Sequence, residues 1–194
     1  MKDKPRIVGL VLAAGTSSRM GVRNKLTTPY QGRPLLSHCL EQAQRSALCD
    51  LVVVTGHEKT AVAALVPSPM RRVHNPAFAT GMASSLVAGV QSIADQEFHG
   101  AMVLLGDMPL VTSEHINALL NRFRTDGDGS IVVAADGSRL GNPVVFARRY
   151  FDALIQLDGD RGAKPVIEAH KSSAVLVDIG EAAHRDFDTP DAFN

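Results

Sequence analysis

The sequence predicts an α/β protein in which helices cover both faces of a mostly parallel sheet. Short runs of aliphatic residues alternate along the chain with segments whose apolar residues recur every three or four positions, which is typical of this fold class. The first run, Ile7–Leu12, is apolar throughout, as expected for a strand that is buried on both faces. With 194 residues, 45% of them hydrophobic and 21% charged, the chain is interpreted as a single globular domain, residues 1–194.

The strands are expected where aliphatic and β-branched residues gather between turn-forming residues. In chain order they are Ile7–Leu12, Leu51–Thr55, Arg71–His74, Ala101–Leu105, Ser130–Ala134, Pro143–Phe146 and Ala174–Asp178. The helices are expected at Pro34–Ala47, Glu58–Leu65, Ser84–Ile93, Ser113–Arg124, Arg148–Leu154 and Ala163–His170. In the first helix, Pro34 suits the first turn, and an apolar stripe follows at helical spacing, Leu36, Cys39, Leu40 and Ala43.

Charge and cysteine content narrow the class of protein. Lys plus Arg and Asp plus Glu each number 20, so we expect no nucleic-acid partner bound through a broad basic face. The polar start Met1–Pro5 and the short apolar run after it predict neither a secretory signal nor a membrane span. Cys39 and Cys49 are separated by about 15 Å of helix, too far for a disulfide. We therefore expect reduced thiols, with Cys39 in the core, in a cytoplasmic protein.

A loop of small residues, glycine and cations follows the first strand. Residues 11–21 read Val-Leu-Ala-Ala-Gly-Thr-Ser-Ser-Arg-Met-Gly, and Lys25 comes shortly after. Backbone amides in such a turn can close on anionic oxygens, and Arg19 and Lys25 could neutralise further charge. The spacing between Gly15 and Gly21 fits neither the Walker loop nor the dinucleotide motif G-x-G-x-x-G. We interpret the segment as a triphosphate loop; an ordinary loop with surface Arg and Lys is the alternative.

Two later segments supply carboxylates. Asp107 follows the aliphatic run Ala101–Leu105, and Pro109 then turns the chain. Asp186 and Asp188 lie shortly before Pro190, which suits the start of a final short helix. Magnesium prefers oxygen ligands and usually takes one or two carboxylates together with phosphate oxygens. Asp107 is therefore the first candidate ligand and Asp188 its partner, with helix capping as the alternative role for each.

Two further loops could contact substrates. Ser84 and Ser85 follow Gly81 where a loop opens a helix; either serine could cap it, and the amino end of a helix attracts oxygens. Residues 159–164, Gly-Asp-Arg-Gly-Ala-Lys, could bind the phosphate of a second substrate or form only an exposed turn. The sequence contains no His-Glu-x-x-His, Cys-x-x-Cys or G-x-S-x-G, so neither a zinc site nor a serine nucleophile is expected.

Taken together, these motifs resemble those of the molybdenum cofactor nucleotidyltransferases, the MobA-like NTP transferases, with the cytidylyl branch the most similar. The resemblance rests on the segments 12–25, 81–85, 106–109, 159–164 and 186–190, which occur in the family's order. It implies a Rossmann-like three-layer sandwich of the nucleotide-diphospho-sugar transferase type. It also implies transfer of a nucleotidyl group from an NTP to the phosphate of the pterin cofactor, with release of diphosphate and with magnesium, or manganese, as the metal.

The resemblance implies a role for each site residue. Those at the nucleotide would be Leu12, Ala13, Ala14, Gly15, Arg19, Lys25, Gly81, Ser84, Ser85 and Asp107, of which Arg19, Lys25 and Asp107 would act in catalysis. Asp107 and Asp188 would hold the metal. Those near the acceptor would be Asn142, Asp160, Arg161 and Lys164, with Asn142 standing where the family more often has His and Lys164 where it more often has Arg.

The donor and acceptor follow from the same resemblance. Leu-Ala-Ala-Gly at residues 12–15 is more similar to the cytidylyl branch than to the Leu-Ala-Gly-Gly of guanylyl members, so the expected substrates are CTP and a molybdopterin-type acceptor. Three alternatives stay open: guanylyl transfer from GTP, transfer to a sugar phosphate, and a non-catalytic module that carries a cofactor to a molybdoenzyme client.

Overall fold

The computed structural model describes residues 4–20, 23–126 and 130–193. Its centre is a seven-stranded sheet in the order β5-β4-β1-β6-β8-β7-β9. The strands are β1 (Ile7–Ala13), β4 (Asp50–Thr55), β5 (Arg71–His74), β6 (Gly100–Leu105), β7 (Ile131–Asp136), β8 (Arg139–Ala147) and β9 (Ala174–Asp178). Each expected strand overlaps one of these, and the predicted mostly parallel sheet is confirmed.

Strand direction brings the carboxyl ends of four neighbouring strands to one edge. β1 is parallel to β4 and β6, and β4 is parallel to β5. β8 runs antiparallel to both β6 and β7, while β9 is parallel to β7. Leu12 of β1 lies beside Leu105 of β6, and Ala13 lies beside Thr55 of β4. The loops after these three strands therefore leave the sheet side by side.

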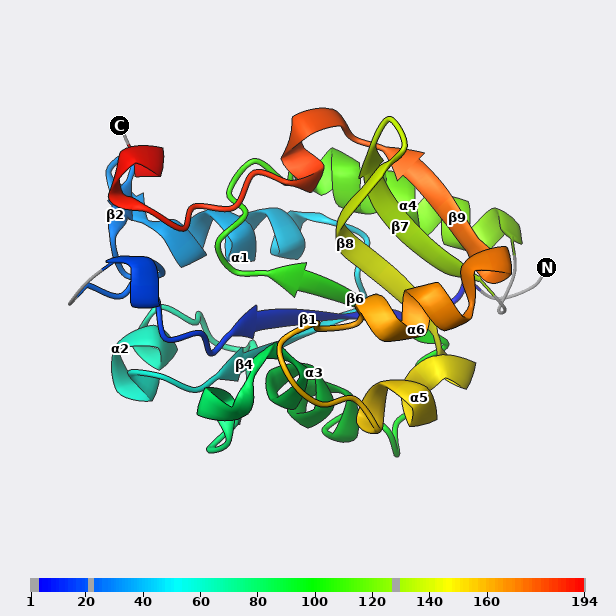
Figure 1. The fold of residues 1–194 in the computed structure, drawn as a ribbon, viewed down its shortest axis with the longest axis horizontal. Coiled ribbons are helices and arrows are strands. Elements are labelled where there is room, and N and C mark those ends of the chain that lie inside the picture. Colours follow the sequence, from blue (N-terminus) through cyan, green and yellow to red (C-terminus); the bar gives the residue numbers. More distant parts are fainter. Residues whose placement is uncertain (1–3, 21–22, 127–129, 194) are drawn as a thin grey trace.

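Helices cover both faces of the sheet (Figure 1). On one face α1 (Leu35–Arg45) packs against α4 (Ser113–Asp126), and on the other α3 (Met82–Gln91) packs against α5 (Phe151–Ile155). Two shorter helices complete the set, α2 (Lys59–Ala64) beside β4 and α6 (Lys164–Ala169) ahead of β9. Each of the six overlaps a helix expected from the sequence. None of the described helices is long and apolar enough to cross a membrane.

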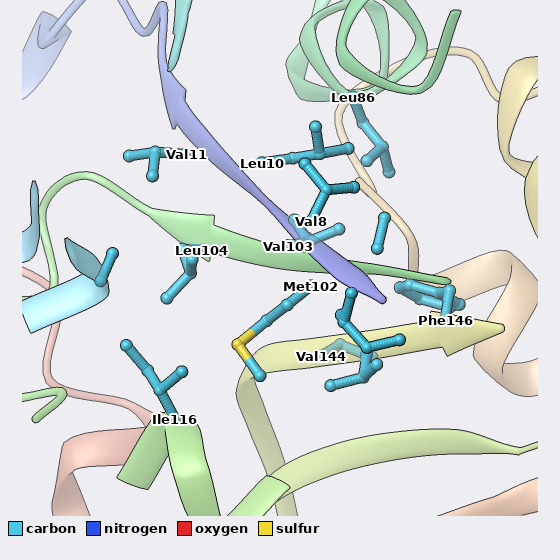
Figure 2. Packing of buried hydrophobic residues seen from close by; sticks show 14 of the residues in the cluster. Val8, Leu10, Val11, Leu86, Met102, Val103, Leu104, Ile116, Val144 and Phe146 are labelled. Carbon is cyan, nitrogen blue, oxygen red and sulfur yellow. The ribbon is translucent and has the colours of Figure 1, made fainter. Parts of the chain in front are cut away.

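The core lies between the sheet and the two helix layers. Val8 and Leu10 of β1 point toward Leu86 of α3, whereas Met102 and Leu104 of β6 point toward α4 (Figure 2). Successive side chains of a strand point to opposite faces, and here both faces are covered. The central strands are therefore apolar at nearly every position, which explains why the sequence shows continuous runs rather than alternation.

The structure adds local features that the hydrophobic pattern does not predict. β2 (Pro29–Tyr30) and β3 (Arg33–Pro34) form a short hairpin, and strands of this length carry no periodicity from which to recognise them. β8 begins at Arg139 rather than at Pro143, and α3 begins at Met82 rather than at Ser84. The expectation that Ser84 or Ser85 caps that helix is therefore wrong, because both serines lie inside it.

Both cysteines are free thiols, with Cys39 buried and Cys49 exposed, as expected. Burial, together with the nearby charge of Asp107, raises the pKa of the Cys39 thiol to about 12. The Cys39 thiol also donates a hydrogen bond to the carbonyl oxygen of Leu105 at 3.4 Å. At neutral pH this thiol is protonated and shielded.

We expect the two thiols to react at very different rates with dithiobis-nitrobenzoate, because only the thiolate reacts. Cys49 should react in the native protein, and faster as the pH rises, since partial burial raises its pKa above the ordinary value as well. Cys39 should react only after unfolding in guanidinium. The Cys49→Ser variant is the control: rapid colour development from native Cys49→Ser would contradict the burial of Cys39.

Candidate active site

A cavity of about 600 Å³ opens beyond the carboxyl ends of β1 and β6. Five segments far apart in the sequence line it: the loop after β1, the turn after β6, the start of α3, the loop that contains Asp160, and the segment that contains Asp186 and Asp188. Ligands of α/β sheets bind at this edge because the loops after neighbouring strands converge there. In Figure 1 the blue segment that follows β1 and the red C-terminal segment lie at the same end of the sheet.

The loop after β1 turns backbone groups toward the cavity. Gly15 faces open space, with no atom within 4 Å of the position that a Cβ would occupy. The backbone amides of Gly15 and Thr16 donate no hydrogen bond to another described residue. Ser17, at φ 54°, accepts a hydrogen bond from the backbone amide of Lys25 at 3.1 Å. The loop thus leaves amides available to an anion and fixes the backbone of Lys25 beside them.

Three carboxylates and one ammonium group lie close together in the lining of this cavity. One oxygen each of Asp107, Asp186 and Asp188 lies within 4.8 Å of the others. Lys25 forms ion pairs with Asp107 and with Asp188. The exposed fractions of these side chains are 15% for Lys25, 13% for Asp107 and 22% for Asp188, so the charges interact with little screening by water.

The electrostatics of the cluster keep Lys25 charged. Burial lowers the pKa of Lys25, but the charges and hydrogen bonds of Asp107 and Asp188 outweigh burial, and the net pKa is raised above its ordinary value. Burial raises the pKa of Asp186, and the negative charges of Asp188 and Asp107 raise it further. The negative charges of Asp107 and Asp188 contribute to both shifts, while burial raises the pKa of Asp186 and opposes the rise at Lys25.

The donor set of the cluster fits a hard divalent cation. Mg²⁺ and Mn²⁺ take oxygen ligands, and carboxylates are the side chains that supply them with charge. Three carboxylate oxygens within 4.8 Å of one another can converge on one ion. Asp186 is the residue that the sequence-based metal assignment, limited to Asp107 and Asp188, left out.

Phe187 holds the acidic segment against the sheet. Its side chain is buried, and its ring contacts Tyr30 of the β2–β3 hairpin and Phe193, with centroids 4.8 and 5.5 Å apart. Its backbone amide donates to the carbonyl oxygen of Asp107 at 3.1 Å. Because Phe187 stands between Asp186 and Asp188, this anchor sets where both carboxylates lie relative to Asp107.

The loop at residues 159–160 is bonded to the start of α3. Asp160 accepts a hydrogen bond from the amide of Met82 at 3.2 Å, and the carbonyl oxygen of Gly159 accepts one from the amide of Ala83 at 3.0 Å. Gly81, at φ +121°, immediately precedes the first helical residue, Met82. The cap that the sequence assigned to serine therefore comes from a residue that is distant in sequence, and the first amides of α3 already have partners.

The other predicted site residues are distributed as follows. Leu12, Ala14, Ser85 and Asp160 line the cavity, Ala13 is buried beside it, and Ser84 accepts a hydrogen bond from Asn75 at 2.8 Å. Three described residues expected at the acceptor, Asn142 in β8, Arg161 and Lys164, lie outside the lining, and Arg161 pairs with Glu168 at 2.8 Å. The side chain of Arg19 and all of Gly21 lie outside the described residues.

Sequence reasoning missed two apolar residues of the cavity wall. Phe78 and Met82 line the cavity, and Met82 is among the most exposed large hydrophobic residues of the described chain. A methionine next to Gly81 in a loop was the available signal, because an apolar residue at a loop–helix junction has no periodicity that assigns it to the core.

The chain matches one family model and several curated proteins. Residues 9–174 match the model described as MobA-like NTP transferase domain. The chain is 30% identical over 208 residues to the purine catabolism protein PucB of Bacillus subtilis (strain 168), covering 98% of this chain and 95% of PucB. It is also 30% identical over 194 residues to nicotine blue oxidoreductase of Paenarthrobacter nicotinovorans, covering 96% and 94% of the two chains.

Among solved structures, Rv0371c from Mycobacterium tuberculosis H37Rv superposes with a TM-score of 0.85 and 25% sequence identity, covering 98% of this chain and 97% of that one. The structure of Rv0371C in complex with manganese gives a TM-score of 0.79 at 23% identity, covering 97% and 96%. These likenesses show that the fold is shared over the whole chain.

We expect Gly81→Ala to lower the free energy of unfolding by about 1–3 kcal/mol. An alanine is strained at the positive φ of this position, and its Cβ would approach the 159–160 loop too closely. A Cβ at Gly81 would lie 2.4 Å from the carbonyl oxygen of Gly159, which would push the 159–160 loop off α3. Gly15→Ala is the matched control, since its Cβ would meet no atom within 4 Å. Urea unfolding measures both; equal midpoints for Gly81→Ala and the wild type would contradict the contact.

Proposed function

The chain belongs to the MobA-like NTP transferase family and is a nucleotidyltransferase; we propose that it transfers CMP from CTP to the phosphate of molybdopterin and releases diphosphate. One observation carries the proposal. Lys25 and the three carboxylates of Asp107, Asp186 and Asp188 meet in the cavity lined by the loop after β1. A triphosphate with its divalent cation is the ligand whose charges complement that combination of amides, ammonium and carboxylates.

This reaction requires of the protein mainly that it align the two reactants and stabilise the charge that develops on the phosphate oxygens. In the proposed step an oxygen of the acceptor phosphate attacks the α-phosphorus of CTP in line. A new P–O bond forms as the bond from the α-phosphorus to the diphosphate oxygen breaks. Lys25 and Arg19 would stabilise charge on the transferring and leaving oxygens, while the amides of Gly15 and Thr16 hold the triphosphate. Mg²⁺, held by Asp107 and Asp188, would when bound neutralise triphosphate charge, and Mn²⁺ has similar oxygen preferences.

The choice of CTP as the donor rests on residues 12–15, where β1 ends and the loop after it begins. Ala14 lines the cavity, and its Cβ leaves less room for a base than the glycine of the guanylyl members would, which favours a pyrimidine over the larger guanine. The choice of acceptor rests on the 159–164 loop. Asp160 borders the cavity, and Arg161 and Lys164 follow it on the outer side, where they could meet the anionic part of a pterin phosphate.

Diphosphate release over a panel of donors and acceptors tests the proposal. The purified protein is mixed with CTP, GTP or ATP, with Mg²⁺, and with either molybdopterin or a sugar 1-phosphate. We expect diphosphate only from CTP with molybdopterin. Release from GTP, or with the sugar phosphate alone, would replace the donor or the acceptor. CTP binding in calorimetry without diphosphate from any acceptor would favour a non-catalytic carrier.

Asp107→Asn should lower turnover by on the order of 10²-fold or more, because it removes a carboxylate proposed to hold the divalent cation that neutralises the triphosphate. Asp178→Asn is the matched control: the same substitution at an exposed residue at the end of β9, outside the cavity lining. The rate is measured at saturating Mg²⁺ with folding checked by circular dichroism. Near-normal turnover of folded Asp107→Asn would rule out its role as a metal ligand.

A further inference from the structure

Lys25 forms ion pairs with Asp107 and Asp188, the two carboxylates that are proposed to hold the divalent cation. We propose that Lys25 makes metal binding depend on the nucleotide: its ammonium competes with the cation for these carboxylates, and the triphosphate draws it away. This inference rests on the proposed function, because it concerns how the metal and the nucleotide come to occupy that same site.

The contacts of Lys25 place the two cations in direct competition. The ammonium nitrogen of Lys25 contacts one oxygen of Asp107 and one of Asp188. All three side chains are at most 22% exposed, so two cations on the same pair of carboxylates would repel each other with little screening. A divalent cation that takes both oxygens therefore has to displace the ammonium.

The displaced ammonium has a nearby partner in the triphosphate. Lys25 lines the same cavity as Gly15, Thr16 and Ser17, the loop proposed to hold the triphosphate. Its backbone stays in place, because its amide is bonded to the Ser17 hydroxyl at 3.1 Å. Only the flexible side chain has to turn from the carboxylates to the phosphates.

Charge balance makes the exchange favourable only when both ligands are present. Three carboxylates lie within 4.8 Å of one another, so removing the ammonium without a replacement leaves them facing one another unneutralised. A cation without nucleotide would take from the ammonium the two carboxylates that hold it, with no triphosphate to replace them. Metal and triphosphate together satisfy every group, so each should raise the affinity for the other by the same factor, as thermodynamic linkage requires.

The test measures Mn²⁺ binding by electron paramagnetic resonance, with and without CTP, in the full-length wild type and variants. Lys25→Met and Lys25→Gln should bind Mn²⁺ alone on the order of tenfold more tightly than the wild type. The same variants should bind CTP more weakly at saturating Mn²⁺. Lys25→Arg, which keeps the charge, should retain weak binding of Mn²⁺ alone, and Lys171→Met, an exposed lysine outside the cavity lining, should match the wild type throughout.

The outcomes separate this inference from the proposed function. Folded Lys25→Met and Lys25→Gln that bind Mn²⁺ alone no more tightly than the wild type overturn the competition, while CTP turnover by the wild type would stand. A wild type that binds Mn²⁺ neither alone nor with CTP overturns both. Two neutral variants are used so that a folding defect in one leaves the other to decide.

Discussion

The ammonium of Lys25, shared by two carboxylates, is the interaction on which the arrangement of the site depends. It joins the loop after β1 to the turn after β6 and to a segment 163 residues further along the chain. Two like charges about 4 Å apart repel by about 4 kcal/mol at an effective dielectric constant of 20, so three carboxylates within 4.8 Å need a cation among them. In the proposed function, the same excess of negative charge that holds Lys25 in place attracts the divalent ion that accompanies the nucleotide.

The rest of the structure brings these groups together from separate places. β1 and β6 are adjacent and parallel, so the loop after Ala13 and the turn that holds Asp107 leave the sheet at one edge. The third segment has no strand to position it and relies instead on the buried ring of Phe187 and the bond from its amide to Asp107. On the opposite wall, Asp160 and Gly159 bind the first amides of α3. The end of β6 positions Asp107, the loop after β1 positions Lys25, and the contacts of Phe187 position Asp186 and Asp188.

The hydrophobic pattern and the short motifs of the sequence were sufficient to predict the strands and three of the charged residues of the site. The central strands are largely buried aliphatic runs, and all seven strands of the main sheet were predicted. The family motifs marked Lys25, Asp107 and Asp188, which the structure brings together. The direction of β8 was not predicted, although Asp136-Gly137 between β7 and β8 is a hairpin signal. The cap of α3 by Asp160 could not be predicted, because two residues 78 positions apart make it. The β2–β3 hairpin and the anchoring of Phe187 on Tyr30 are likewise set by tertiary packing alone.

The place of Phe187 in the chain has a consequence for biosynthesis. Every strand of the sheet lies before residue 179, whereas Asp186 and Asp188 follow it. The strands can therefore pair, and most of the core can be buried, before the segment that carries two of the three acids docks. The cavity gains its full charge only when the aromatic anchor emerges and docks against Tyr30. Cleavage just before this segment would remove two of the three carboxylates of the cavity while leaving every strand of the main sheet in the chain.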